Sequence, residues 1–289
     1  MKKLALLLLC MAPLAAAQDS AIAFKSSEVA PGFHLLEGDG AFGGGNVTLF
    51  VGDEYVLLID DAMVPTVSAL MDAATEVAGR PVDFVINTHA HGDHVGGNEY
   101  LSANGALIVA HDNLRKRMQG NPELDTGPGA LPVLTFADAV TFHVNGQEAY
   151  VFHIEKAHTD GDAAILFREA NVLVAGDVMF NKLFPFIDLD NGGSVSGYKA
   201  GQQKLIDMVN DDTRIVPGHG PVASKADLIT NLDVLKDSEA RVKALFDDGM
   251  GEEDIVAANP LSVYHDEYNW GFITTERMTR TLIRSLTTD

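Results

Sequence analysis

Three histidines and one aspartate lie within six consecutive positions, in the segment HAHGDH at residues 89–94. Neutral imidazole is the commonest metal-binding side chain in proteins and carboxylates bind hard divalent ions, so this density is typical of a metal site. In extended backbone the side chains at positions i and i+2 point the same way, which allows His89 and His91 to bind one ion. Asp93 and His94 lie where the loop turns into a helix and can reach a second ion. The alternative is a surface loop that is rich in histidine by chance.

Two metal ions need more ligands than this loop supplies, and single strong ligands follow later strand candidates. They are His158 in AHTDGD, Asp177 in AGD and His219 in PGHG. Each lies in a glycine-containing loop, where the backbone bends tightly and functional residues are concentrated. Four separate segments of the chain therefore supply candidate ligands for a pair of ions.

The candidate ligands follow short apolar segments that are typical of buried strands, and helical patterns come between them. Apolar and β-branched runs predict strands at 47–51, 55–60, 84–86, 107–110, 139–144, 148–154, 163–167, 172–175 and 214–216. Helical spacing predicts helices at 64–77, 111–119, 198–209, 225–247, 252–258 and 274–285, with a long loop over 179–193. The strands occur in two batches, each interrupted and followed by helices. We therefore expect an α/β fold in which two sheets pack face to face with helices outside.

This ordered set of motifs resembles the metallo-β-lactamase fold superfamily, whose signature is His-x-His-x-Asp-His followed by isolated His, Asp and His. The resemblance covers the chain from about Val47 to Gly220. It implies an αββα sandwich of two mixed β-sheets with outer helices, and a site with two zinc ions at one edge between the sheets. By resemblance, the first zinc is bound by His89, His91 and His158, the second by Asp93, His94 and His219, and Asp177 bridges the two.

The candidate ligand set differs from those of two families within this superfamily, which narrows the expected chemistry. Some lactamases carry a cysteine at the second metal, whereas the one cysteine here, Cys10, lies in an N-terminal segment that we expect to be removed. Flavodiiron oxygen reductases carry a glutamate at the position of His91, so an all-imidazole first site favours zinc and hydrolysis over iron and redox chemistry.

Two zinc ions about 3.5–4 Å apart lower the pKa of a shared water molecule from about 15.7 toward 7 and direct it at a carbonyl group. Asp93 is the catalytic candidate, because its carboxylate can orient this water and accept its proton. The hypothesis is hydrolysis of a carbonyl–heteroatom bond in a small molecule, with a β-lactam amide as the best single guess. The alternatives are a lactonase or a thioesterase similar to glyoxalase II, then a phosphodiesterase, and, outside catalysis, a metal-binding module.

Three residues outside the ligand set are candidates for substrate binding. Lys182 is the one cation in an apolar segment after Asp177 and could pair with a substrate carboxylate. Phe184 belongs to the same apolar segment, and His111 stands at the start of a predicted helix. For each of the three, the alternative is an ordinary surface or packing role.

The N-terminal segment predicts export. Lys2 and Lys3 precede an apolar run and then small residues at 15–17, which is the order of a cleaved signal peptide over residues 1–17. The apolar run is about a dozen residues long, whereas a membrane-spanning helix needs about 20, so we expect no stable membrane insertion after cleavage. Residues 18–289 are expected to form one hydrolase domain with a helical C-terminal part, located in the periplasm or secreted.

The strongly negative net charge of the chain limits which partners are expected. The chain has a formal net charge of −21, and loss of Lys2 and Lys3 makes it more negative. Such a field repels polyphosphates, so nucleic acid is not expected as a partner and a phosphodiesterase is disfavoured. A small-molecule substrate is the partner that remains.

Overall fold

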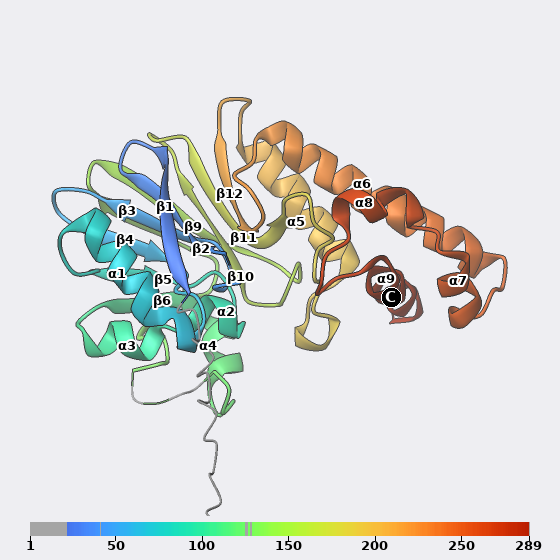
Figure 1. The fold of residues 1–289 in the computed structure, drawn as a ribbon, viewed down its shortest axis with the longest axis horizontal. Coiled ribbons are helices and arrows are strands. Elements are labelled where there is room, and N and C mark those ends of the chain that lie inside the picture. The colour runs from blue at the N-terminus through green and yellow to red at the C-terminus, as the bar shows by residue number, and fades with distance from the viewer. Residues whose placement is uncertain (1–21, 41, 125–126, 128, 289) are drawn as a thin grey trace, which may run out of the picture.

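Two β-sheets pack face to face in this protein, with helices on their outer sides (Figure 1). The computed structural model describes residues 22–40, 42–124, 127 and 129–288. The predicted signal peptide, residues 1–17, lies outside these residues.

The first sheet has the strand order β1-β2-β3-β4-β5-β6-β7. Its strands are β1 (Ala23–Ala30), β2 (Phe33–Asp39), β3 (Val47–Val51), β4 (Val56–Ile59), β5 (Phe84–Ile86), β6 (Leu107–His111) and β7 (Leu134–Phe136). Neighbours are antiparallel from β1 to β4 and parallel from β4 to β7. The second sheet has the order β12-β11-β10-β9-β8, and it is antiparallel except for the parallel pair β11 and β12. Its strands are β8 (Ala139–Val144), β9 (Gln147–Ile154), β10 (Asp162–Phe167), β11 (Val172–Phe180) and β12 (Arg214–His219).

Helices cover the outer face of each sheet. The α-helices are α1 (Val67–Ala78), α2 (Gly92–Val95), α3 (Asn98–Ala103), α4 (Asp112–Met118), α5 (Val195–Met208), α6 (Lys225–Asp247), α7 (Glu252–Ala258), α8 (His265–Tyr268) and α9 (Thr275–Thr288). Short 3-10 helices are η1 (Val64–Thr66), η2 (Leu189–Asn191) and η3 (Ser262–Tyr264). Helix α1 packs on the first sheet, whereas α5 and α6 pack on β11 of the second, with α9 beyond them (Figure 1). No helix among the described residues is both long enough and apolar enough to cross a membrane.

Alternation along the strands divides their side chains between two apolar layers. Leu57 and Ile59 of β4 point into the core between the sheets, and Val56 and Leu58 point to the layer under α1. This division follows from the period of two, which sends successive side chains to opposite faces of the sheet. Both layers are buried, because each face of the sheet is covered by another layer. A third cluster joins the outer face of the second sheet to the C-terminal helices.

The predicted α/β fold of two mixed sheets with outer helices, the αββα sandwich, is confirmed. The hairpin of β3 and β4 and the helices α6 and α7 were all predicted from the sequence, whereas β1, β2 and β7 were not. Strand β11 also continues to Phe180, so Asp177 lies within a strand rather than in a loop after one. The reason is a register shift against β12 beside Gly176, whose backbone is left-handed (φ 52°), which lets the strand resume after a local irregularity.

Candidate metal centre

All seven candidate ligands meet at one edge of the sandwich, although they come from four segments of the chain. His89 and His91 lie in the loop after β5, and Asp93 and His94 lie in α2. The others are His158 between β9 and β10, Asp177 in β11, and His219 at the end of β12. Parallel strands bring their carboxyl ends to the same edge of a sheet, which is why loops distant in the sequence converge here.

Four of these side chains form the first group: His89, His91, His158 and Asp177, whose donor atoms lie within 4.8 Å of one another. His158 Nε2 is 2.8 Å from His91 Nδ1 and 3.4 Å from Asp177 Oδ2. His89 Nε2 is 3.6 Å from the same carboxylate oxygen. His91 therefore faces the group with Nδ1, and the other two histidines face it with Nε2.

Asp93, His94 and His219 form the second group, also within 4.8 Å of one another. His219 Nε2 is 3.4 Å from Asp93 Oδ2 and 3.4 Å from His94 Nε2. Asp177 contacts this group as well, because its Oδ1 is 3.3 Å from His94 Nε2 and its Oδ2 is 3.5 Å from His219 Nε2. The carboxylate of Asp177 thus lies between the two groups.

The donor atoms of both groups fit bound cations. His89 Nε2 and Asp177 Oδ1 are buried and make no hydrogen bond to any residue that the structure describes. A buried polar atom left without a partner is costly, and a metal ion removes that cost by accepting the lone pair. Ring nitrogens of His91 and His158 also face each other at 2.8 Å, so the two rings can bind the same ion.

Charge differs between the two groups. Burial lowers the pKa of His158 to about 4 and holds that of His89 well below its usual range, so these imidazoles are neutral at neutral pH. Burial alone would also lower the pKa of His94, but neighbouring carboxylates, that of Asp177 first, outweigh it and raise the pKa to about 10. Burial also acts to lower the pKa of His219, but the carboxylates of Asp177 and Asp93 outweigh it and raise this pKa to about 9. Without metal, the second group therefore holds protons that a metal has to displace.

Carboxylates outside the ligand set orient two of the imidazoles. Asp188 Oδ2 is 2.8 Å from His91 Nε2, and Asp60 Oδ2 is 2.8 Å from His94 Nδ1. Asp60 also accepts hydrogen bonds from the backbone N–H and the hydroxyl of Thr88, at 2.7 and 2.8 Å. Such contacts set the tautomer and the direction of a metal-binding ring. Sequence reasoning missed both carboxylates; Asp60 could have been found because it follows a buried strand, whereas nothing local marks Asp188.

The loop that carries His158 is held by Asp162. Its carboxylate accepts hydrogen bonds from the backbone N–H groups of His158 (2.6 Å) and Thr159 (2.9 Å) and from the Thr159 hydroxyl (2.5 Å). His158 Nδ1 is itself 2.7 Å from the carbonyl oxygen of Phe186, which leaves Nε2 facing the centre. Asp160, two residues before Asp162, forms an ion pair with Arg117 instead.

Two glycines allow the backbone to approach the ligands closely. A Cβ at Gly218 would lie 1.8 Å from Asp177 Oδ1, and a Cβ at Gly45 would lie 2.2 Å from His94 Cε1. Any side chain at either position would therefore displace a candidate ligand.

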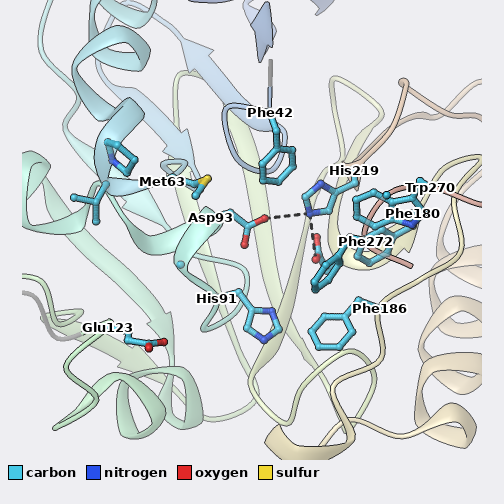
Figure 2. A pocket seen from close by; sticks show the side chains of 15 residues that line it. Phe42, Met63, His91, Asp93, Glu123, Phe180, Phe186, His219, Trp270 and Phe272 are labelled. Atoms are coloured by element: carbon cyan, nitrogen blue, oxygen red, sulfur yellow. Dashed lines mark ion pairs between the residues drawn. The ribbon is translucent and has the colours of Figure 1, made fainter. Parts of the chain in front are cut away.

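One cavity of about 740 Å³ opens onto the centre, and Figure 2 shows its lining. His91, Asp93, Asp177 and His219 reach it from the metal centre. The rest of the wall is largely apolar, with the side chains of Phe42, Met63, Val64, Pro65, Phe180, Phe186, Trp270 and Phe272. A reacting molecule can therefore reach both ligand groups from one side.

None of the three predicted substrate-binding residues lines this cavity. Phe184 is 1% exposed and packs in the core beneath the second sheet. Lys182 is exposed, outside the cavity lining. His111 is buried, stacks on His153 with ring centroids 3.8 Å apart, and has its Nε2 2.8 Å from the carbonyl oxygen of Ala137. The prediction rested on position along the chain, after Asp177 for Lys182 and Phe184 and at a helix start for His111. Such a position does not say which way a side chain points.

An αββα sandwich with a buried cluster of histidines and aspartates at one edge, open to a cavity, is the arrangement of a metal-binding centre that a small molecule can reach. The sequence profile of the Metallo-beta-lactamase superfamily matches residues 40–219, and the chain belongs to this superfamily. The match covers every candidate ligand, and it ends at His219.

Relatives and solved structures agree with this assignment. The chain is 31% identical over 150 residues to a hydroxyacylglutathione hydrolase of Polaromonas sp., covering 51% of this chain and 52% of the relative. It is 30% identical over 136 residues to a hydroxyacylglutathione hydrolase of Methylococcus capsulatus, covering 44% and 48%. The chain thus spans about half the length of these curated relatives. A metallo-beta-lactamase from Pontibacter korlensis superimposes with a TM-score of 0.64 at 19% identity, over 74% of this chain and 99% of the other, which shows a shared fold.

Proposed function

We propose that this protein is a hydrolase with two zinc ions that cleaves a thioester or a similarly activated acyl bond of a small molecule. The observation that carries the proposal is the position of Asp177, whose carboxylate lies within 3.6 Å of His89, His94, His158 and His219 and faces the cavity. One carboxylate between two histidine-rich groups suits a pair of ions that share a ligand. Imidazole with carboxylate is a donor set that zinc accepts readily.

Two zinc ions held by these groups would polarise a substrate carbonyl and acidify a water molecule. The chain itself supplies the orientation. Asp93 is 23% exposed at the cavity wall, where its carboxylate can accept a hydrogen bond and then the proton of the attacking water. Asp188 holds the ring of His91 through Nε2 and so keeps Nδ1 directed at the centre. The water oxygen bonds to the acyl carbon as the carbon–sulfur bond breaks, and the products are a carboxylate, a thiol and one proton.

Thioester cleavage has better support than β-lactam cleavage. The curated relatives at 30% and 31% identity carry the name hydroxyacylglutathione hydrolase, and a hydroxyacylglutathione is a thioester. The metallo-beta-lactamases resemble this chain at 19% and 14% identity, which supports the fold alone. The β-lactam expectation from the sequence is therefore replaced by its alternative, the thioesterase.

Export is also part of the proposal. The charged, apolar and small-residue order of residues 1–17 supports a signal peptide, and thus a periplasmic or secreted hydrolase. A chain with a net charge of −21 is suited to a small substrate rather than to nucleic acid.

The test uses the purified full chain, with zinc measured by elemental analysis and hydrolysis measured on a thioester, a lactone and the β-lactam nitrocefin. We expect about two zinc ions per chain, thioester hydrolysis faster than that of the other two, and loss of activity with a chelator that zinc restores. One zinc or less per chain after growth with ample zinc contradicts the dinuclear centre. Faster turnover of nitrocefin would return the assignment to a β-lactamase.

A further inference from the structure

The wall of the cavity beside the second ligand group is built from aromatic rings. Phe180 stacks on His219 with centroids 4.9 Å apart, and Phe42 lies 5.9 Å from the same imidazole on a nearly parallel plane. Trp270 and Phe272 continue this wall, as Figure 2 shows. Phe42 and Phe272 remain 56% and 46% exposed, so apolar surface is available to a ligand.

These rings are held in place before any ligand binds. The indole N–H of Trp270 donates a hydrogen bond of 3.0 Å to the carbonyl oxygen of Phe184. Phe272 packs edge-on against Trp270 and Phe186, at centroid distances of 5.7 and 5.3 Å. Trp270 and Phe272 belong to the segment between α8 and α9, beyond the last residue of the superfamily profile. The C-terminal part of the chain therefore contributes to the cavity that the catalytic part opens onto.

The cavity presents no basic side chain to a ligand. Among the described residues that line it, none is lysine or arginine, and the charged group outside the metal centre is Glu123, which is exposed. Arg277 lies outside the lining, where its exposed guanidinium packs over the rings of Phe272 (4.1 Å) and Phe186 (5.2 Å) and donates to the carbonyl oxygen of Phe272. A ligand whose carboxylates lie inside the cavity would meet apolar rings and Glu123 there, and these carboxylates would lose water without gaining a partner.

From this wall we infer the substrate class, an inference that rests on the proposed hydrolase function. The cavity takes an acyl compound whose acyl group is aromatic or long aliphatic and whose leaving group carries no negative charge. Glutathione carries two carboxylates at neutral pH, so hydroxyacyl thioesters of glutathione fit this cavity poorly, although the relatives are named for them. The apolar rings would bury the acyl group and the metal centre would bind the carbonyl.

The first test compares four thioesters on the zinc-loaded full chain. Phenylacetyl and lactoyl groups are each joined to N-acetylcysteamine, which is neutral, and to glutathione. We expect kcat/KM for phenylacetyl-N-acetylcysteamine to exceed that of the lactoyl compound by at least about tenfold, the scale on which an apolar pocket discriminates. We expect a preference of similar size for N-acetylcysteamine over glutathione with the phenylacetyl group constant.

A second measurement reads occupancy of the cavity without any turnover. Trp270 is the only tryptophan in the chain and lines the cavity, so its fluorescence reports binding there directly. The probes are two thioethers that cannot be hydrolysed, S-phenethyl-N-acetylcysteamine and S-phenethylglutathione. We expect the neutral thioether to change the fluorescence at about tenfold lower concentration than the glutathione thioether.

Two matched variants separate a local charge from the net charge of the protein. Val64→Lys places a cation at the cavity wall, where Val64 is 56% exposed, and Val263→Lys places one on η3, where Val263 is 63% exposed and outside the cavity lining. Val64→Lys should raise the kcat/KM ratio of the glutathione to the N-acetylcysteamine thioester by about two- to fivefold, the scale of an exposed charge pair. High salt should remove this gain. Val263→Lys should leave the ratio unchanged.

The outcomes distinguish this inference from the function on which it rests. Hydrolysis of all four thioesters at similar rates, or tighter binding of S-phenethylglutathione, overturns the substrate class and leaves the hydrolase function standing. An equal effect of Val64→Lys and Val263→Lys also overturns it, because the charge of the cavity would then not matter. Failure to hydrolyse any of the four, with two zinc ions present, overturns the proposed function and this inference together.

Discussion

Replacing Asp93 by asparagine removes a charge at the centre while keeping the size of the side chain. Asp93 Oδ2 lies 3.4 Å from His219 Nε2 and 3.6 Å from His94 Nε2. An aspartate near the start of a helix can also serve as its N-cap, a role that asparagine fills equally well. In the structure α2 begins at Gly92 and its N-cap is His91, so Asp93 lies in the first turn and does not cap the helix.

The size of the expected effect follows from the charge of Asp93. Burial alone would raise the pKa of this carboxyl, but His94 and His219 outweigh it and lower the pKa to about 2, so Asp93 is ionised at neutral pH. Two unit charges about 4 Å apart interact by about 4 kcal/mol at an effective dielectric constant of about 20, which corresponds to about a thousandfold in a binding constant. We therefore expect Asp93→Asn to weaken zinc binding at the second group by about a thousandfold. Turnover at saturating zinc should still fall by more than about a hundredfold, because a positioned acid–base group is lost.

The assay has to separate lost metal from lost orientation. Zinc affinity is measured by competition with a chromophoric chelator, turnover is measured on the best thioester with zinc in excess, and folding is checked by circular dichroism. Asp72→Asn, at an exposed position on α1 outside the cavity lining, is the charge-matched control. Turnover of Asp93→Asn within a few-fold of the parent at saturating zinc would refute the role proposed for this carboxylate.

Three further predictions follow from the structure and the sequence. Asp188→Ala should lower the zinc affinity of the first group by about 10- to 100-fold, because His91 loses its orienting carboxylate. Asp188→Asn should recover part of this loss. If a chelator competition gives Asp188→Ala the same zinc affinity as the parent, the contact with His91 has no role in metal binding. With the pKa values of His94 and His219 raised to about 10 and about 9, both imidazoles are cationic at neutral pH. Zinc uptake should therefore release protons, and zinc affinity should rise with pH up to about 10. Calorimetry in two buffers of different ionisation enthalpy measures that release, and its absence contradicts the protonated state. For protein exported from its native host we expect an N-terminus at Gln18 or within about two residues of it, whereas an intact Met1 on soluble cytoplasmic protein would contradict export.

Local sequence was sufficient for the candidate ligands and for most of the elements that carry them. His89, His91, Asp93 and His94 stand next to one another after an apolar strand, and a ligand directly after a buried strand must lie at the edge of its sheet. The strands themselves were marked by apolar period and by glycine-rich turns. Strands β1 and β7 were missed because they carry few buried side chains and have little apolar pattern to detect.

Tertiary structure alone decided which other groups surround the ligands. Asp188 is 97 positions from His91, and the contact between them exists only because the loop after β11 folds back over the first group. The cavity wall likewise combines Phe42, Val64 and Trp270, from opposite ends of the chain. A ligand motif is set by the geometry of a few consecutive residues and is therefore visible in the sequence. A pocket wall is set by how separate layers pack, because any apolar side chain of suitable size can supply it, and no local pattern marks which ones do.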